Sequence, residues 1–236
     1  EFEFEKEKDN VAKAIADFEL KYPIVQDNDF STWRAYDNHY WPAKYFIDKD
    51  GYIRYSHFGE GAYDESEKII QQLLTETGAQ VVQNPIANPG YEVYAQTPET
   101  YFGYLRLSNF SSPEKVTQDA SADYTVPSEI PVNTFAFGGA WSVMPEYATP
   151  EKGAKLYLNF EAKEVFLVAR SKNGPSQLKV YLDGKLEAFG KDNYNGIVTV
   201  GTDRLYKLIN LSTPGRHILR LEFVDENVEI FTFTFG

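Results

Sequence analysis

The sequence predicts two domains of different class, an α/β domain followed by an all-β sandwich. Residues 43–77 have the pattern of a β-hairpin followed by one helix. From residue 102 onward, β-branched and aromatic runs alternate with turn residues roughly every 8–12 positions, which is typical of a β-sandwich. Because prolines and glycines interrupt both patterns in between, we expect the α/β domain at 1–80, a linker at 81–100 and the sandwich at 101–236.

Short elements open the α/β domain. Residues 1–5 alternate glutamate and phenylalanine, which is the period of a strand and predicts the end of one. Residues 11–20 place most of their apolar side chains on one helical face. Residues 22–26 then predict a short strand, and Asp29 or Ser31 is expected to cap a brief helix.

A hairpin and a helix complete this domain. Asp48-Lys49-Asp50-Gly51 is a turn sequence between two β-rich runs, residues 43–47 and 52–58. The helix expected over residues 63–77 carries acidic side chains in its first turn, where the helix dipole favours them. This order predicts one antiparallel strand pair with a helix after it.

The sandwich is predicted from alternation and from one strong turn signal. Leu156, Leu158 and Phe160 alternate with polar or tyrosine side chains, which predicts one buried and one solvated face. Asp183-Gly184 is a strong two-residue hairpin signal. The expected strands cover residues 135–137, 141–144, 156–160, 164–170, 177–182, 197–200, 204–209, 217–223 and 228–235.

Composition limits the classes of function. The chain of 236 residues has a net charge of -12, which argues against nucleic acid or an anionic membrane surface as a partner. It contains no cysteine, so its own residues supply no disulfide and no thiolate metal ligand. No apolar run approaches the roughly 20 residues that cross a bilayer. Phosphate-loop, serine-hydrolase and zinc-protease motifs are absent from the sequence, and we expect no cofactor and no metal.

Many uncommon residues in the first part occur in the order of a known family. They are Tyr22-Pro23, Asp27-Asn28-Asp29, Thr32-Trp33-Arg34-Ala35-Tyr36, Tyr40-Trp41-Pro42-Ala43, Ile47-Asp48, Gly51 and His57-Phe58-Gly59-Glu60-Gly61. This series resembles the thioredoxin-like domain of DipZ-type proteins, which join a cytochrome-biogenesis-like membrane part, a thioredoxin-like domain and a β-rich C-terminal domain. Residues 97–104, 141–150, 160–163 and 231–236 resemble that C-terminal domain, whose jelly-roll shape is similar to carbohydrate-binding modules.

The resemblance implies an incomplete thioredoxin fold. The half that carries Cys-x-x-Cys in the family has no counterpart in this chain, so we interpret the chain as a fragment without a catalytic residue of its own. The parent protein would be an extracytoplasmic, membrane-anchored oxidoreductase that passes electrons from a membrane partner to proteins with disulfides. An incomplete sheet also leaves an unpaired edge, where a second copy of the chain would pair to form a homo-oligomer.

Trp41 and Pro42 are the site residues that this resemblance implies in the first domain. Pro42 precedes a strand, where its missing N–H removes no ladder hydrogen bond, and a cis bond there would present Trp41 at one end of the sheet. In the family this dipeptide is the loop on which the substrate backbone docks. The alternative is a tight structural turn.

The sandwich has candidate residues for a different function. Sugar faces stack on flat aromatic rings, and Trp141, Tyr147, Tyr181 and Tyr194 are candidates for such a carbohydrate site. The alternative for each ring is an ordinary position in the core or on the surface. A third hypothesis gives the sandwich a purely structural role, in which it packs on the thioredoxin-like half.

Overall fold

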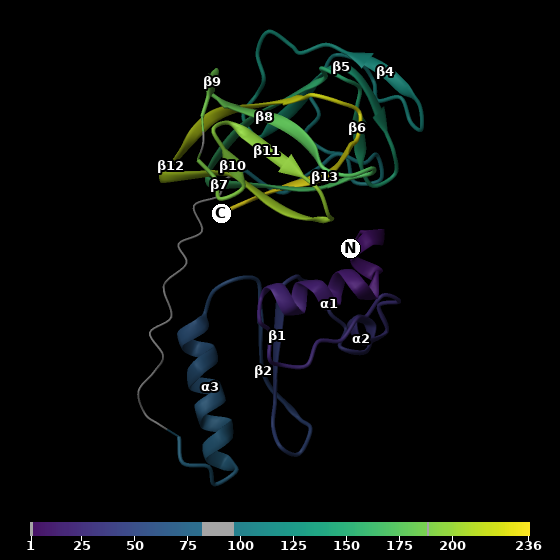
Figure 1. The fold of residues 1–236 in the computed structure, drawn as a ribbon. Coiled ribbons are helices and arrows are strands. Elements are labelled where there is room, and N and C mark those ends of the chain that lie inside the picture. Colours follow the sequence, from purple (N-terminus) through teal and green to yellow (C-terminus); the bar gives the residue numbers. More distant parts are fainter. Residues whose placement is uncertain (1, 82–96, 188) are drawn as a thin grey trace. The chain divides into compact units, whose positions relative to one another are not determined.

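The protein forms two compact units, which are seen in a computed structural model that describes residues 2–81, 97–187 and 189–236 (Figure 1). The α/β unit is Ala14–Glu92, and the sandwich unit combines Glu1–Lys13 with Val93–Gly236. Residues 2–13 therefore pack with the sandwich, whereas the sequence predicted them in the α/β domain. In chain order, the α/β unit is an insertion between two segments of the sandwich unit.

The predicted helices are confirmed, with shifted ends. They are α1 (Lys8–Asp17), α2 (Ser31–Ala35) and α3 (Tyr63–Glu76). The prediction of a strand at residues 22–26 is wrong, because the described strands of this unit pair only with each other and leave that segment no neighbour. None of the helices in the described ranges combines the length and the apolar composition that a bilayer crossing needs.

The hairpin of the α/β unit is also confirmed. β1 (Ala43–Ile47) and β2 (Ile53–Phe58) pair antiparallel, with Ala43 opposite Phe58. Gly51 closes the turn with a positive φ of 88°, a conformation that glycine adopts without steric cost. The turn chemistry therefore sets the register of the two strands.

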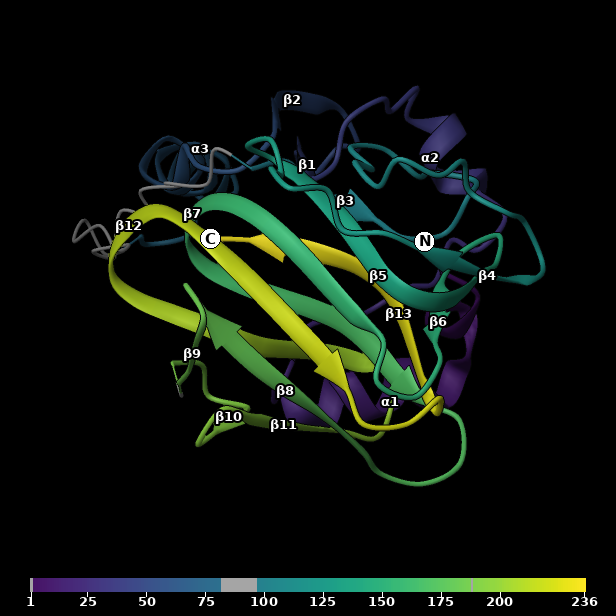
Figure 2. The same ribbon diagram turned by 90° about the horizontal axis from the view of Figure 1, so that it is seen from above.

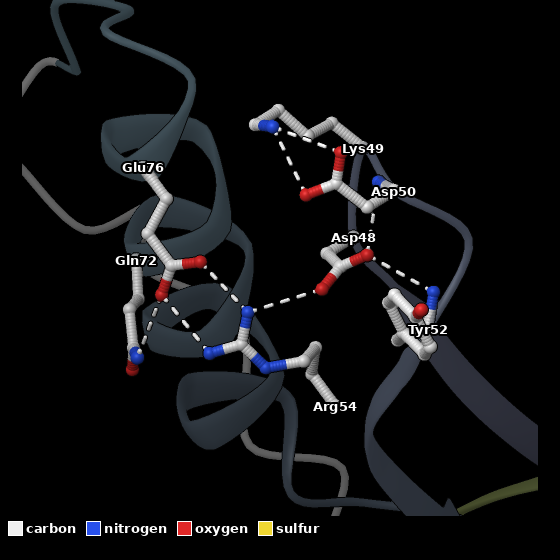
Figure 3. Close-up of polar contacts among 7 residues, drawn as sticks. All are labelled: Asp48, Lys49, Asp50, Tyr52, Arg54, Gln72 and Glu76. Carbon is white, nitrogen blue, oxygen red and sulfur yellow. Dashed lines mark hydrogen bonds and ion pairs between the residues drawn. The ribbon is translucent and has the colours of Figure 1, made fainter.

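A network around Arg54 joins this hairpin to α3 (Figure 3). The guanidinium of Arg54 donates to both carboxylate oxygens of Glu76, at 2.8 and 3.2 Å, and to Asp48 at 3.2 Å. Asp48 also accepts the backbone N–H of Asp50 and Tyr52, each at 3.0 Å. The Tyr52 N–H is the main cause of a lowered pKa at Asp48, and the hydrogen bond from Arg54 lowers the pKa of Glu76.

We expect this network to weaken in acid. Because both folded-state pKa values lie below those of the unfolded chain, the stabilisation is present above about pH 4 and is lost as the carboxylates gain protons below it. Arg54→Met should therefore lower the hydrogen-exchange protection factors of β2 and α3 at pH 6 by about twofold, and their further loss at pH 3 should be smaller than in the unmodified chain. Lys49→Met is the matched control, since Lys49 pairs with the adjacent Asp50 within the turn. Equal acid sensitivity of the Arg54 variant and the unmodified chain would contradict this account.

From Thr97 onward, the regular elements of the described chain are all strands (Figure 2). The strands are β3 (Thr100–Tyr101), β4 (Ser121–Tyr124), β5 (Thr134–Val143), β6 (Ala148–Pro150), β7 (Lys155–Ser171), β8 (Ser176–Leu182), β9 (Lys185–Leu186), β10 (Asn193–Tyr194), β11 (Ile197–Val200), β12 (Arg204–Phe223) and β13 (Val228–Phe235). Nine of them follow the order β10-β11-β8-β12-β7-β13-β6-β5-β4 in the sheet, while β3 pairs with β13 and β9 with β8. The Asp183-Gly184 hairpin is confirmed, with positive φ at both residues between β8 and β9.

Two long bent strands make this sheet continuous. The predicted strands 156–160 and 164–170 are one strand, β7, and 204–209 and 217–223 are one strand, β12. Figure 2 shows the bend along β12. The register of β12 against β7 shifts between Lys207 and Ile209 and again between Asn210 and Gly215. The first half of β7 pairs with β5 and the second half with β13. Side chains from these strands enclose one large core.

Two predictions near the domain boundary need correction. The predicted strand end at residues 1–5 is a 3₁₀ turn, η1 (Glu3–Lys6), because Phe2 and Phe4 both turn toward Phe231 of β13 instead of alternating. The predicted linker 81–100 falls mostly on residues 82–96, which lie outside the described residues. Its end belongs to the sandwich, where Thr97 N–H donates to the Glu161 carbonyl at 3.3 Å and β3 pairs with β13.

Candidate functional site

Asn38 builds the loop that leads into β1. Its side chain is buried, accepts a hydrogen bond from the Tyr45 hydroxyl at 3.0 Å and donates to the Tyr40 carbonyl at 2.9 Å. A buried amide with partners on both sides resists displacement, because breaking either bond leaves a polar atom unpaired. The loop is therefore fixed to the first strand of the hairpin.

Trp41 and Pro42 lie at the end of this loop, directly before β1. The bond between them is cis, and the Pro42 carbonyl accepts the Gly59 N–H at 2.8 Å at the end of β2. The Trp41 side chain is 77 % exposed. A fixed loop thus holds a large aromatic ring out toward solvent.

Further aromatic rings lie around the hairpin, of which Tyr36, Tyr40 and Phe58 are exposed and Tyr45 is half-buried. Tyr40 lies 4.8 Å from Phe58, and Tyr45 lies between Phe58 and Tyr36 at 6.0 and 5.0 Å, measured between ring centroids. Among the described residues of the α/β unit, the buried ones are Asn38 and Ser66, and no apolar side chain is fully buried. An apolar surface without a core behind it is suited to contact with further polypeptide.

The acidic residues near this loop have structural roles. Asp27 accepts the N–H groups of Thr32 and Trp33, both at 2.8 Å, and these bonds at the start of α2 lower its pKa, with the Thr32 N–H the largest cause. The Asp29 carboxylate accepts the longer bond from the Ser31 N–H at 3.3 Å, so Asp27 supplies most of the capping that the sequence assigned to Asp29 or Ser31. In the described part of the chain, no group of three or more histidine, cysteine or acidic side chains is arranged to hold a metal ion.

The four aromatic candidates of the sandwich lie in different environments. Trp141 is fully buried, with its ring stacked on Phe137 at 4.2 Å, so it belongs to the core and presents no face to a sugar. Tyr147 packs on Phe231 at 5.6 Å, and its burial raises its pKa. Tyr194 is 80 % exposed on the short strand β10. Within the described ranges, no ring contact joins any two of the four.

Tyr181 has a partner that sequence reasoning missed. The Arg220 guanidinium lies 3.8 Å from the Tyr181 ring centroid, and Arg220 is opposite Tyr181 on one side and Tyr157 on the other. The Nε atom of Arg220 is buried without a hydrogen-bond acceptor. The stacked cation covers the ring face that a sugar would need, and the cross-strand register that brings it there is not visible in the sequence.

Comparison with known proteins extends over the whole chain. Residues 97–236 match the family model described as "Thioredoxin like C-terminal domain". The chain is 37 % identical over 244 residues to Protein DipZ of Mycobacterium tuberculosis and of Mycobacterium bovis, an alignment that covers 100 % of this chain and 33 % of each relative. The chain thus spans about a third of the length of these relatives.

More distant similarities cover parts of the chain. The thiol-disulfide oxidoreductase YkuV of Bacillus subtilis is 31 % identical over 67 residues, 28 % of this chain and 45 % of that protein. Among solved structures, a family two carbohydrate esterase from Clostridium thermocellum in complex with cellohexaose has a TM-score of 0.32 at 21 % identity, covering 39 % of this chain and 27 % of the other. A likeness this weak supports no conclusion about ligands.

These similarities confirm the resemblance that the motifs around Trp41 indicated. The family match covers more than half of the chain, the DipZ similarity covers all of it, and the YkuV similarity connects it to thiol-disulfide oxidoreductases. The chain therefore belongs to the thioredoxin-like C-terminal domain family, and its DipZ relatives match both of its units.

Proposed function

We propose that this chain is the substrate-docking and C-terminal part of an extracytoplasmic thiol-disulfide oxidoreductase that its parent protein anchors in a membrane. The single observation that carries the proposal is the exposed Trp41 ring, which Asn38 and the Gly59 N–H hold in a fixed loop. The full-length similarity to DipZ supports it. The order of strands in the β-rich unit supports the proposal that this unit is a jelly-roll sandwich.

The proposed reaction is the reduction of a protein disulfide by two thiols that lie outside this chain. One thiolate attacks a sulfur of the substrate disulfide, forms a mixed disulfide and releases the other substrate sulfur as a thiolate. The second thiol of the oxidoreductase loses its proton and attacks the oxidoreductase sulfur of the mixed disulfide, which releases the second substrate sulfur as a thiolate. The oxidoreductase then carries a disulfide, and the two substrate thiolates take up protons and become thiols. A membrane partner would return the two electrons to the oxidoreductase.

Trp41 and Pro42 would hold the substrate during these steps. An extended segment beside the substrate disulfide would lie against the Trp41 ring, and its contact with the neighbouring apolar surface would keep the disulfide close to the attacking sulfur. The loop offers shape and apolar area and takes no proton or electron itself. It is therefore a positioning element.

The exposed apolar side chains of the α/β unit fit the same proposal. We propose that the remaining half of a thioredoxin fold covers them in the parent protein, because a two-stranded hairpin with α2, α3 and the end of α1 fully buries no apolar side chain among the described residues. Pairing of a second copy at the open strand edge is the competing arrangement.

Cross-linking tests the docking role directly. In the native polypeptide that carries this chain, Trp41 would be replaced by the photoreactive p-benzoylphenylalanine, and Tyr52 would be replaced in a matched control. Tyr52 is 70 % exposed and lies at the turn end of the hairpin. We expect illumination to attach insulin, a protein with disulfides, at position 41 and not at position 52. Equal labelling at the two positions, or labelling at 52 alone, would refute the docking role.

We do not propose carbohydrate binding. Trp141 is buried, Arg220 covers a face of Tyr181, and Tyr147 packs on Phe231. Tyr194 alone keeps an open ring, and one exposed tyrosine is ordinary for a protein surface.

A further inference from the structure

The outer surface of the sandwich carries an aromatic groove at a bulge in β13. The register of β13 against β7 shifts between Ile230 and Thr232, and the residue between them, Phe231, leaves the main core that contains Ile230 and Phe233. Phe231 instead meets Tyr101, Tyr147 and Val168, and these four residues form the groove. A bulge re-aims a side chain in this way because it adds one residue to a period of two.

The occupant of this groove is the beginning of the chain. Phe2 and Phe4 are 6 % and 8 % exposed, and their ring centroids lie 5.0 and 4.9 Å from that of Phe231, both edge to face. The two rings stack on each other at 5.6 Å. The η1 turn brings both rings to one side, which an extended Phe-Glu-Phe segment cannot do.

Two arginine side chains lie beside the aromatic rings of the groove. The Arg106 guanidinium lies 4.7 Å from the Phe2 ring and 4.1 Å from the Tyr101 ring. The Arg170 guanidinium lies 5.4 Å from the Phe231 ring and is itself paired with Glu229 and Asp203. The carboxylates of the segment bond within it, since Glu3 pairs with Lys6 and Glu5 accepts the Phe2 N–H. The rings of Phe2 and Phe4 therefore make the contact with the groove, and Arg106 adds a cation–π contact to Phe2. The backbone of the segment also makes a contact, in which the Glu3 N–H donates to the Glu146 carboxylate at 3.1 Å.

The segment is held by side chains and not by the sheet. Neither Phe2 nor Phe4 belongs to a strand, and β13 keeps its ladder with β7 and β3 independently of them. The ring contacts join Phe2 and Phe4 to Phe231, which are far apart in the sequence. Such a contact can open without unfolding the sandwich.

We propose that the groove is a peptide-binding site whose ligand class is a segment with two phenylalanines one residue apart, and that residues 2–6 occupy it within the chain. The docked segment leads directly into α1, which crosses into the α/β unit after Lys13. A Phe-x-Phe segment of another protein would compete with residues 2–6 for the groove.

The test uses the full chain and a synthetic peptide, Glu-Phe-Glu-Phe-Glu-Lys-Glu, labelled for fluorescence anisotropy. Phe2→Ala/Phe4→Ala empties the groove, so this double variant should bind the peptide at least about tenfold more tightly than the unmodified chain, where the tethered segment competes. Phe18→Ala is the matched control, because Phe18 is 74 % exposed, and it should bind like the unmodified chain. A peptide with alanine at both phenylalanine positions should not bind. Equal binding by the double variant and the unmodified chain, or no binding by the double variant, overturns the proposal.

A second measurement needs no variant and covers the case in which the double variant does not fold. In the unmodified chain, the amides of Glu5 and Glu7 donate to the carbonyls of Phe2 and Phe4, so their hydrogen exchange reports on η1. We expect them to exchange by local opening, independently of denaturant, while β13 exchanges only on global unfolding. Exchange of both regions with the same denaturant dependence would make the segment part of the sandwich fold and would overturn the proposal.

Discussion

Trp141→Ala is expected to destabilise the sandwich by about 3–5 kcal/mol. Trp141 is fully buried, stacks on Phe137 and meets Phe223 edge to face at 5.2 Å. Alanine would leave a cavity among rings from different strands, which cannot all move inward to fill it. Urea denaturation followed by circular dichroism measures the loss as a lower transition midpoint at an unchanged slope.

Tyr194→Ala is the control for this prediction, because it removes an aromatic ring that is exposed on β10. We expect its free energy of unfolding to stay within about 0.5 kcal/mol of the unmodified chain. If Trp141→Ala cost less than about 1 kcal/mol, the ring would not be a core residue, and its role as a surface residue would have to be considered again.

Local patterns were sufficient to predict the parts of the fold that depend on local chemistry. The turn at Asp48-Lys49-Asp50-Gly51 and the hairpin at Asp183-Gly184 were both predicted, because these residues adopt the needed backbone angles at low cost. Alternation along β7 also predicted the burial of Leu156, Leu158 and Phe160. In each case the decisive interactions lie within one element or between adjacent ones.

Contacts between distant segments were not predictable in this way. Period-two alternation in the last strand assigns Phe231 and Phe233 to the same face, but the bulge sends Phe231 outward, where it meets Phe2 and Phe4. Nothing in the local pattern of Glu1-Phe2-Glu3-Phe4-Glu5 distinguishes a strand from a segment whose rings dock on a remote groove. The predicted strand at residues 22–26 was wrong for a related reason, since a strand requires a neighbour to pair with.

The sequence identified the residues of the candidate site, but it predicted their structural surroundings only in part. The motif located Trp41 and Pro42, but Asn38, which fixes their loop, gave no signal beyond being a polar residue near aromatics. Likewise, the aromatic content of the sandwich could not separate the buried Trp141 from the exposed Tyr194, because aromatic residues serve both roles in β-sheets.

Trp41→Ala is expected to lower disulfide reduction by the native polypeptide about tenfold in kcat/KM. The ring is exposed, so its loss should leave the free energy of unfolding within about 0.5 kcal/mol. It would remove the apolar contact that holds the substrate segment. Because that contact is made before and during the reaction alike, most of the effect should appear as a higher KM with little change in kcat.

The most direct test of the central claim is therefore the measurement of kcat and KM for insulin reduction by the native polypeptide with and without Trp41→Ala. Tyr52→Ala serves as the control, since it removes another exposed ring at the other end of the hairpin. The account predicts a KM raised about tenfold for the Trp41 variant and unchanged kinetics for the Tyr52 variant. Unchanged kinetics for the Trp41 variant, or an equal loss in both variants, would contradict a substrate-docking role for this loop.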